Sequence, residues 1–207
     1  MCDMSPAKNT TVERIILGID PGTNLMGYGV IRTVGNKAEF VQMGVLDIRK
    51  VGDTYMKLKA VYDKVIELVE TYLPDEFAIE SQFFGKNVQS MLKLGRAQGV
   101  AIAAALQRDL PIAEYAPLKI KMSITGNGAA SKEQVASMLQ RQLNIPAESM
   151  EKHLDASDAL GVALCHFYQI NRAVPEKHFN SWKDFAAKNE KRVSGWKEFL
   201  EKKGEKE

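Results

Sequence analysis

Short apolar runs alternate with longer amphipathic stretches along most of the chain. Five of these runs predict β-strands, at residues 14–20, 27–33, 39–48, 77–80 and 112–115. The first ends at Pro21-Gly22, which favours a buried central strand that stops there. Gly35-Asn36 separates the second run from the third and predicts a hairpin.

Apolar residues at helical spacing predict four helices, at residues 54–73, 87–108, 131–143 and 153–171. Pro74 ends the first helix, and Ser131 with Gln134 forms a capping box at the start of the third. The chain therefore runs through three strands, a helix, a strand, a helix, a strand and two helices. This order predicts an α/β protein with a mixed five-stranded sheet flanked by helices.

Composition indicates one soluble globular domain with extensions. The 207 residues are 45% hydrophobic and 26% charged, which is ordinary for such a protein. We expect a disordered extension over residues 1–13, a folded domain over 14–174 and a helical or flexible tail over 175–207. Cys2 and Cys165 lack the spacing of a zinc finger or a disulfide framework. The start carries no secretory signal, and residues 100–106 are too short an apolar run to cross a bilayer, so we expect a cytoplasmic protein.

Charge is unevenly distributed, although the net charge is only +2. Residues 81–145 hold eight basic side chains against three acidic ones. A polyanionic partner such as a nucleic acid would explain this excess, and so would an ordinary solvated face. Charge alone leaves both interpretations open.

Four carboxylates stand where they could share one task. Asp20 ends the first predicted strand, Glu80 ends the fourth, and Asp155 and Asp158 lie three residues apart early in the last helix. If the two strands are central and parallel, their carboxyl ends lie side by side at the edge where such sheets bind ligands. Hard oxygen ligands without His or Cys favour magnesium or manganese. Each acid alone also has a structural explanation: Asp20 as a turn residue, Asp155 as a helix cap.

Longer motifs resemble one family of nucleases. These motifs are GIDPGTNLMGYGVI (18–31), FAIESQFFGKN (77–87), LKLGRAQGVAIAAA (92–105), EYAPLKIKMSITGNGAASKEQV (114–135) and DASDALGVALCH (155–166). In this order and spacing they resemble the bacterial RuvC resolvases. The resemblance implies an RNase H-like fold and a homodimer that cuts four-way (Holliday) DNA junctions by paired nicks on opposed strands. It also implies two Mg²⁺ ions per subunit, which Mn²⁺ can replace, and the branch-migration proteins RuvA and RuvB as partners.

The resemblance also implies roles for individual residues. The four acidic positions of the family match Asp20, Glu80, Asp155 and Asp158, although some members have His in place of Asp155. Its basic positions near the scissile phosphate match Lys121 and Lys132, so these six residues are the candidate catalytic set. For DNA binding we expect, besides the two lysines, four residues that follow the fourth strand: Phe83 near the junction centre, Lys86, Asn87 and Arg96.

Several features have more than one interpretation. The small residues Gly95, Gly99 and Ala103 form a stripe that suits either close packing of their helix on its own sheet or a dimer interface. The string IDPGT also fits the phosphate hairpin of an actin-like or sugar-kinase-like ATPase, but no second glycine-rich phosphate loop is evident. A junction-binding protein without catalysis is a third possibility, against which the presence of all four acids argues. We expect His166 and Cys165 to be core residues.

The tail repeats the pattern WK[DE]F, at residues 182–185 and 196–199. Each Trp–Phe pair has i, i+3 spacing, so it can share one face of a short helix. The tail either folds back on the domain or docks DNA or a protein partner.

Overall fold

β1 (Glu13–Asp20) is the central strand of a five-stranded sheet with the order β3-β2-β1-β4-β5. The computed structural model describes residues 12–81, 87–152 and 156–171. β1 is antiparallel to β2 and parallel to β4, and β4 is parallel to β5. β2 (Leu25–Val34) and β4 (Glu76–Glu80) flank β1, and β3 (Lys37–Asp47) and β5 (Ile112–Tyr115) are the edge strands. The prediction of a mixed five-stranded sheet is confirmed.

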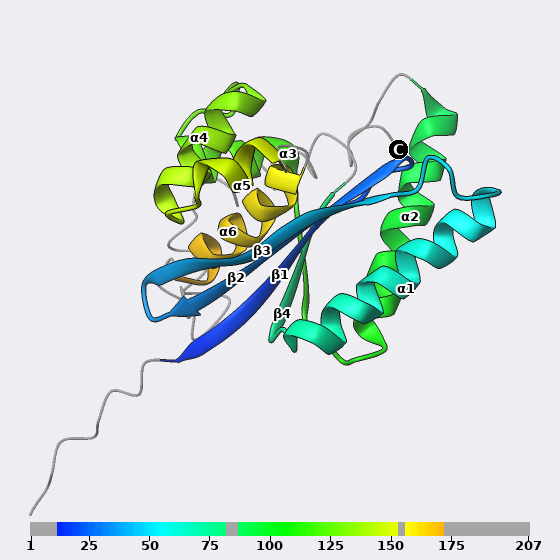
Figure 1. Cartoon of the computed structure of the whole chain (residues 1–207), viewed down its shortest axis with the longest axis horizontal. Helices are drawn as coiled ribbons and strands as arrows, with labels where there is room; N and C mark the ends of the chain where they lie inside the picture. Colours follow the sequence, from blue (N-terminus) through cyan, green and yellow to red (C-terminus); the bar gives the residue numbers. More distant parts are fainter. Residues whose placement is uncertain (1–11, 82–86, 153–155, 172–207) are drawn as a thin grey trace, which may run out of the picture. The chain divides into compact units, whose positions relative to one another are not determined.

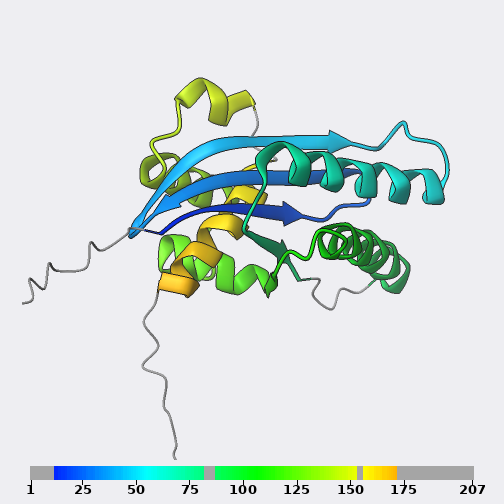
Figure 2. The same cartoon turned by 90° about the horizontal axis from the view of Figure 1, so that it is seen from below.

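Six helices flank this sheet in the described part of the chain. They are α1 (Thr54–Tyr72), α2 (Val88–Leu106), α3 (Pro117–Thr125), α4 (Lys132–Gln142), α5 (Ala147–Lys152) and α6 (Ser157–Asn171). α1 and α2 cover one face of the sheet, and the other helices lie on the opposite face (Figure 1). Figure 2 shows the same arrangement from below, with α1 and α2 on the right and the other helices on the left. None of the helices in these described segments is long and apolar enough to cross a membrane.

Two helices differ from the sequence prediction. α3 was not expected: it begins at Pro117, buries Ile120 and Ile124 one turn apart, and ends at Gly126 in the left-handed conformation, φ 73°. α5 was not expected either; it precedes α6, which begins at Ser157, and the predicted start of the last helix at His153 lies outside the described residues. The capping box of Ser131 and Gln134 is present at the start of α4.

Strand alternation divides the core into two layers. Leu17 and Ile19 of β1 pack with α1 and α2, whereas Ile16 packs with the helices of the other face. By this period of two, Gly18 and Asp20 face α6. In β4 the same rule places Phe77 and Ile79 with α1 and α2, so that Glu80 turns toward α6.

Two glycines let α6 approach the sheet. Gly18 of β1 and Gly29 of β2 are register partners. A Cβ on Gly18 would lie 2.3 Å from the carbonyl oxygen of Ala159, and one on Gly29 would lie 2.5 Å from the Cα of Leu160. Larger residues at these two positions would push the first turns of α6 off the strands. Farther along α6, Cys165 and His166 are buried, as predicted.

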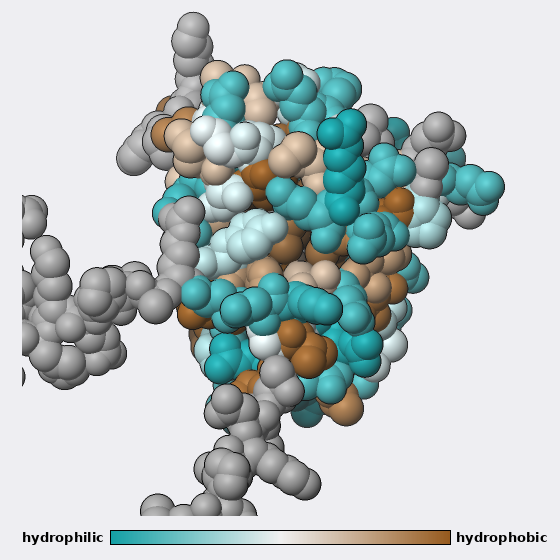
Figure 3. All heavy atoms as spheres, turned by 90° about the vertical axis from the view of Figure 1, so that its left-hand side faces the viewer, coloured by the Kyte–Doolittle hydropathy of each residue, from teal (hydrophilic) through white to brown (hydrophobic). Residues whose placement is uncertain are grey.

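The small-residue stripe of α2 faces away from the sheet. A Cβ added to Gly95 or Gly99 would meet no atom within 4 Å, so close packing of this stripe on its own sheet is excluded. The buried face of α2 is made instead of alanines, namely Ala97, Ala101, Ala104 and Ala105. Figure 3 views the opposite side of the molecule, with α4 and the β2–β3 hairpin, where hydrophilic side chains are interspersed with small hydrophobic areas.

Candidate active site

Three of the predicted acids lie at the carboxyl ends of two central strands and at the start of the helix that covers them. Asp20 is the last residue of β1 and Glu80 the last residue of β4. The parallel register pairs Ile19 with Ile79, so the two strands end together. Asp158 stands in the first turn of α6, the helix that Gly18 admits onto the sheet. The predicted adjacency of the strand ends is therefore confirmed.

The pKa values of these acids show how strongly the groups interact. The pKa of Asp20 is raised to about 6, chiefly by burial and in smaller part by the negative charge of Asp158, against the opposing charge of Lys132. The pKa of Glu80 is raised to about 8 by burial first and then by repulsion from Asp20 and Asp158, with a smaller opposing effect of Lys121. Such a cluster of buried like charges favours a bound cation.

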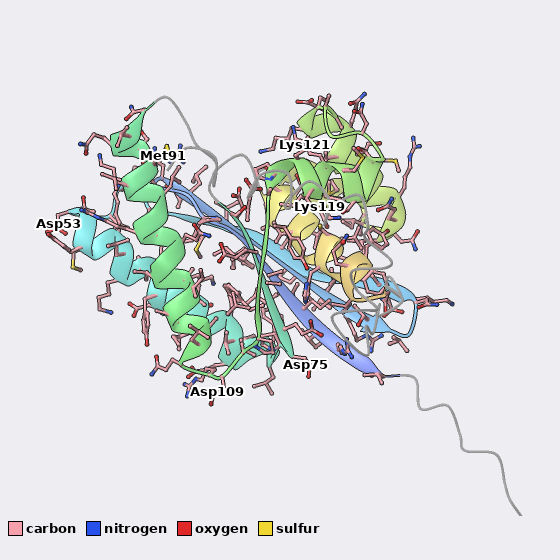
Figure 4. The ribbon with its side chains drawn as sticks, turned by 180° about the vertical axis from the view of Figure 1, so that it is seen from behind. Asp53, Asp75, Met91, Asp109, Lys119 and Lys121 are labelled. Atoms are coloured by element: carbon pink, nitrogen blue, oxygen red, sulfur yellow. The ribbon has the colours of Figure 1, made fainter. Side chains whose placement is uncertain are left out.

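Two lysines complete the surroundings of the acids. Lys132, the first residue of α4, places its Nζ 3.0 Å from an Oδ of Asp158. Lys121 lies on α3, which packs against α6, and is labelled in Figure 4. Glu80, Lys121, Lys132 and Asp158 line one hollow of about 250 Å³. A phosphate group bound in this hollow would therefore have the ammonium groups of both lysines on its walls.

The donor set fits hard divalent cations. Asp20, Glu80 and Asp158 offer only carboxylate oxygens, which Mg²⁺ and Mn²⁺ prefer. Within the described residues, however, no three Asp, Glu, His or Cys side chains are already arranged around one ion position. Lys132 pairs with one carboxylate oxygen of Asp158.

Other predicted site residues have different outcomes. Asp155, Phe83 and Lys86 lie outside the described residues. Asn87 caps α2, because its side-chain oxygen accepts a hydrogen bond from the Ser90 amide at 3.1 Å. This capping role was not predicted, although Asn before a helical apolar pattern is a recognisable signal. Arg96 is exposed on α2.

Comparison with known proteins gives the family. A family model described as crossover junction endodeoxyribonuclease RuvC matches residues 16–166. The RuvC of Bacteroides fragilis is 63% identical over 180 residues, covering 87% of this chain and 96% of that protein. The RuvC of Porphyromonas gingivalis is 56% identical over 180 residues, covering 86% and 95%. Both alignments are longer than residues 14–172, so the similarity continues into the flanking segments.

Solved structures of junction resolvases share the fold of this chain. The Thermus thermophilus RuvC in complex with a Holliday junction substrate superimposes with a TM-score of 0.69 at 28% identity, covering 76% of this chain and 95% of that one. The yeast mitochondrial Holliday junction resolvase Ydc2, at 18% identity and a TM-score of 0.56, shares the fold. The family match favours the resolvase interpretation over the ATPase interpretation. The chain belongs to the RuvC family of crossover junction endodeoxyribonucleases.

Proposed function

We propose that this protein resolves four-way DNA junctions in recombination and repair, by paired metal-dependent nicks on opposed strands. The observation that carries the proposal is the convergence of Asp20, Glu80 and Asp158 from three elements beside Lys121 and Lys132. The Thermus relative that shares the fold was solved with such a junction. We also propose a cytoplasmic location, because the proposed substrate is DNA.

Two Mg²⁺ ions per subunit, replaceable by Mn²⁺, are the proposed cofactors. Asp20, Glu80 and Asp158 would hold them together with Asp155, whose part rests on the family resemblance. When bound, such an ion pair supplies an activated water and stabilises the leaving oxygen of a phosphodiester. The carboxylates would hold the ions at the carboxyl end of the sheet, and bound cations would lower their raised pKa values.

Lys121 and Lys132 act on the phosphate in this proposal. Lys132 holds Asp158 before the ions bind, and once the carboxylate is engaged its ammonium is free to turn to the scissile phosphate. Lys121 approaches from α3 on the same hollow. A positive group aimed at charge that grows in the transition state lowers the barrier to cleavage. Phe83, Lys86, Asn87 and Arg96 are proposed to hold the junction near its centre.

A homodimer would supply the two active sites that paired nicks require. The exposed stripe of α2 is the proposed interface, since Val88, Leu92 and Leu106 are 66%, 54% and 53% exposed beside the open sides of Gly95 and Gly99. Apolar side chains flanking small residues let two helices pack closely. RuvA and RuvB are the proposed partners in branch migration.

The proposed nuclease domain spans residues 14–174, with 1–13 and 175–207 as extensions. Residues up to Arg172 fall within one compact unit, which supports this division. The WK[DE]F repeats lie outside the described residues. Truncation after Val174 is expected to leave metal-dependent nicking intact, and loss of nicking by a folded truncated protein would contradict the division.

The deciding experiment uses a synthetic four-way junction with Mg²⁺, with Mn²⁺ and with EDTA, each with and without ATP. The proposal expects symmetric nicks on opposed strands that need the metal and ignore ATP. Mapping of the strand ends and a linear duplex control establish structure specificity. Nicking in EDTA, or equal cleavage of the linear duplex, would refute it.

A further inference from the structure

A second hollow, of about 480 Å³, lies on the other side of the sheet from the acids. It is formed by the starts of α1 and α2 and by the turn that follows β1. Asp53 at the start of α1 and Met91 in the first turn of α2 mark this end of the helix pair in Figure 4. Gly22 lines the hollow and follows Asp20 by two residues, a reach of at most about 7 Å. The hollow therefore begins beside the candidate active site.

Two lysines from different helices line this hollow. Lys57 projects from α1 and Lys93 from α2. Within the described residues neither forms an ion pair, whereas Lys59 on the same helix lies 2.5 Å from a carboxylate oxygen of Asp63. Two like charges lining one depression raise the local positive potential, which favours an anion between them.

Neutral hydrogen-bonding side chains line the same hollow. Thr23 and Asn24 come from the turn after β1, and Ser90 lies one turn before Lys93 on α2. The one carboxylate on the wall, that of Asp53, already accepts hydrogen bonds of 2.9 Å from the amides of Tyr55 and Met56. These bonds also occupy the amino end of α1, so the lysines and the neutral groups remain for a ligand.

We propose that this hollow binds backbone phosphates of the junction DNA, within about two nucleotides of the scissile phosphate. The inference rests on the proposed function and extends it to residues outside the acid site. Asp20 faces α6 while the hollow opens toward α1 and α2, so a strand that contacts both must cross the carboxyl end of β1. The hollow then fixes the direction in which the cut strand leaves the metal site.

The first test measures junction affinity against salt concentration in EDTA, where no cleavage is expected. Each lost phosphate contact lowers the slope of log K against log salt by about 0.9, which is about an eightfold weaker affinity at 0.1 M salt. The Lys57→Ala, Lys93→Ala double variant is expected to lose one to two such contacts, and the arginine pair at the same positions to restore them. Lys59→Ala is the matched control, since this lysine is exposed on α1 but outside the hollow.

A second test locates the contact on the DNA. Neutral methylphosphonate groups are placed singly along the cut strand. The wild-type protein should lose affinity at one or two positions next to the scissile phosphate, and the double variant should be insensitive to the same positions. Insensitivity of the wild type near the cut would overturn the proposal.

The outcomes separate this inference from the proposed function. If the wild type neither binds nor cuts junctions, the proposed function fails. If it does both, and the folded double variant keeps the salt slope of the Lys59→Ala control, this inference alone fails. Binding of inorganic phosphate with unchanged DNA affinity would make the hollow a small-anion site and would also overturn it.

Discussion

Replacing Asp20 by Asn should make the metal-free protein more stable while abolishing nicking. In the folded protein the pKa of Asp20 is raised from its ordinary 3.8 to about 6, chiefly by burial. A shift of this size corresponds to about 3 kcal/mol, so above pH 6 the ionised group costs the folded state that much relative to the unfolded chain. Asn keeps the shape of the side chain and removes the charge.

The sign of the pH dependence follows from the direction of the shift. Because the folded pKa is raised, this contribution lowers the stability of the wild type as pH rises from about 4 through 6. The gain from Asp20→Asn should therefore reach about 3 kcal/mol at pH 8 and fall below about 1 kcal/mol at pH 4. For a domain of this size that is a rise in thermal midpoint of roughly 6–12 °C at pH 8.

Thermal unfolding in EDTA at several pH values measures the gain in stability of Asp20→Asn. Unfolding with increasing Mg²⁺ measures how far the ion stabilises each protein. Added Mg²⁺ should raise the midpoint of the wild type at pH 8 more than that of the variant, because the ion binds the folded acids. Asp63→Asn is the matched control, since Asp63 is exposed and pairs with Lys59. A variant that unfolds at or below the wild-type midpoint at pH 8 would refute the account of Asp20 as a buried, repelled ligand.

Three further predictions concern the surroundings of the acids. Lys121→Ala and Lys132→Ala should lower single-turnover cleavage rates at saturating enzyme by a factor on the order of 10² and affect junction affinity less; unchanged rates would assign both lysines to solvent. Gly18→Ala should cost about 1–3 kcal/mol by forcing α6 outward, and Mg²⁺ affinity measured by titration calorimetry should fall as well; undiminished Mg²⁺ affinity would exclude the close approach of α6 as a positioning device. His166→Leu should destabilise the fold by roughly 3 kcal/mol in urea unfolding. It removes a buried side chain whose Nε2 lies 2.5 Å from the Glu76 carboxylate. Adding Glu76→Gln to the same chain should recover part of that loss.

Asp20 and Glu80 were predictable because each stands at the end of an apolar run. The apolar run before Asp20 stops at Pro21, and the run before Glu80 is too short for a helix, so both acids were placed at strand ends. Their adjacency needed only the assumption that the two strands are parallel neighbours, which the register of β1 and β4 confirms. The assignment of Lys121 and Lys132 came from the family motifs, since the charge excess of residues 81–145 singles out no position.

Other parts of the site depend on contacts between distant residues. Gly18 and Gly29 read as ordinary strand residues until the register of β1 and β2 sets them opposite each other beneath α6. Lys57 and Lys93 come from separate helices, and no spacing in the sequence indicates that they share a hollow. α3 escaped prediction because its nine residues bury only two apolar side chains and carry no side-chain cap.

Stability and reactivity are opposed at one place in this fold. The glycine pair brings α6 onto the sheet, and this approach brings Asp158 toward Asp20 and Glu80 in a partly buried region. The resulting repulsion destabilises the metal-free protein and is the property that favours divalent cations. Lys132 offsets part of it until an ion binds, since it both pairs with Asp158 and opposes the rise in the pKa of Asp20. A cation bound by these acids would relieve the same repulsion, so the proposed function predicts that the metal-free protein gains stability when the ion binds.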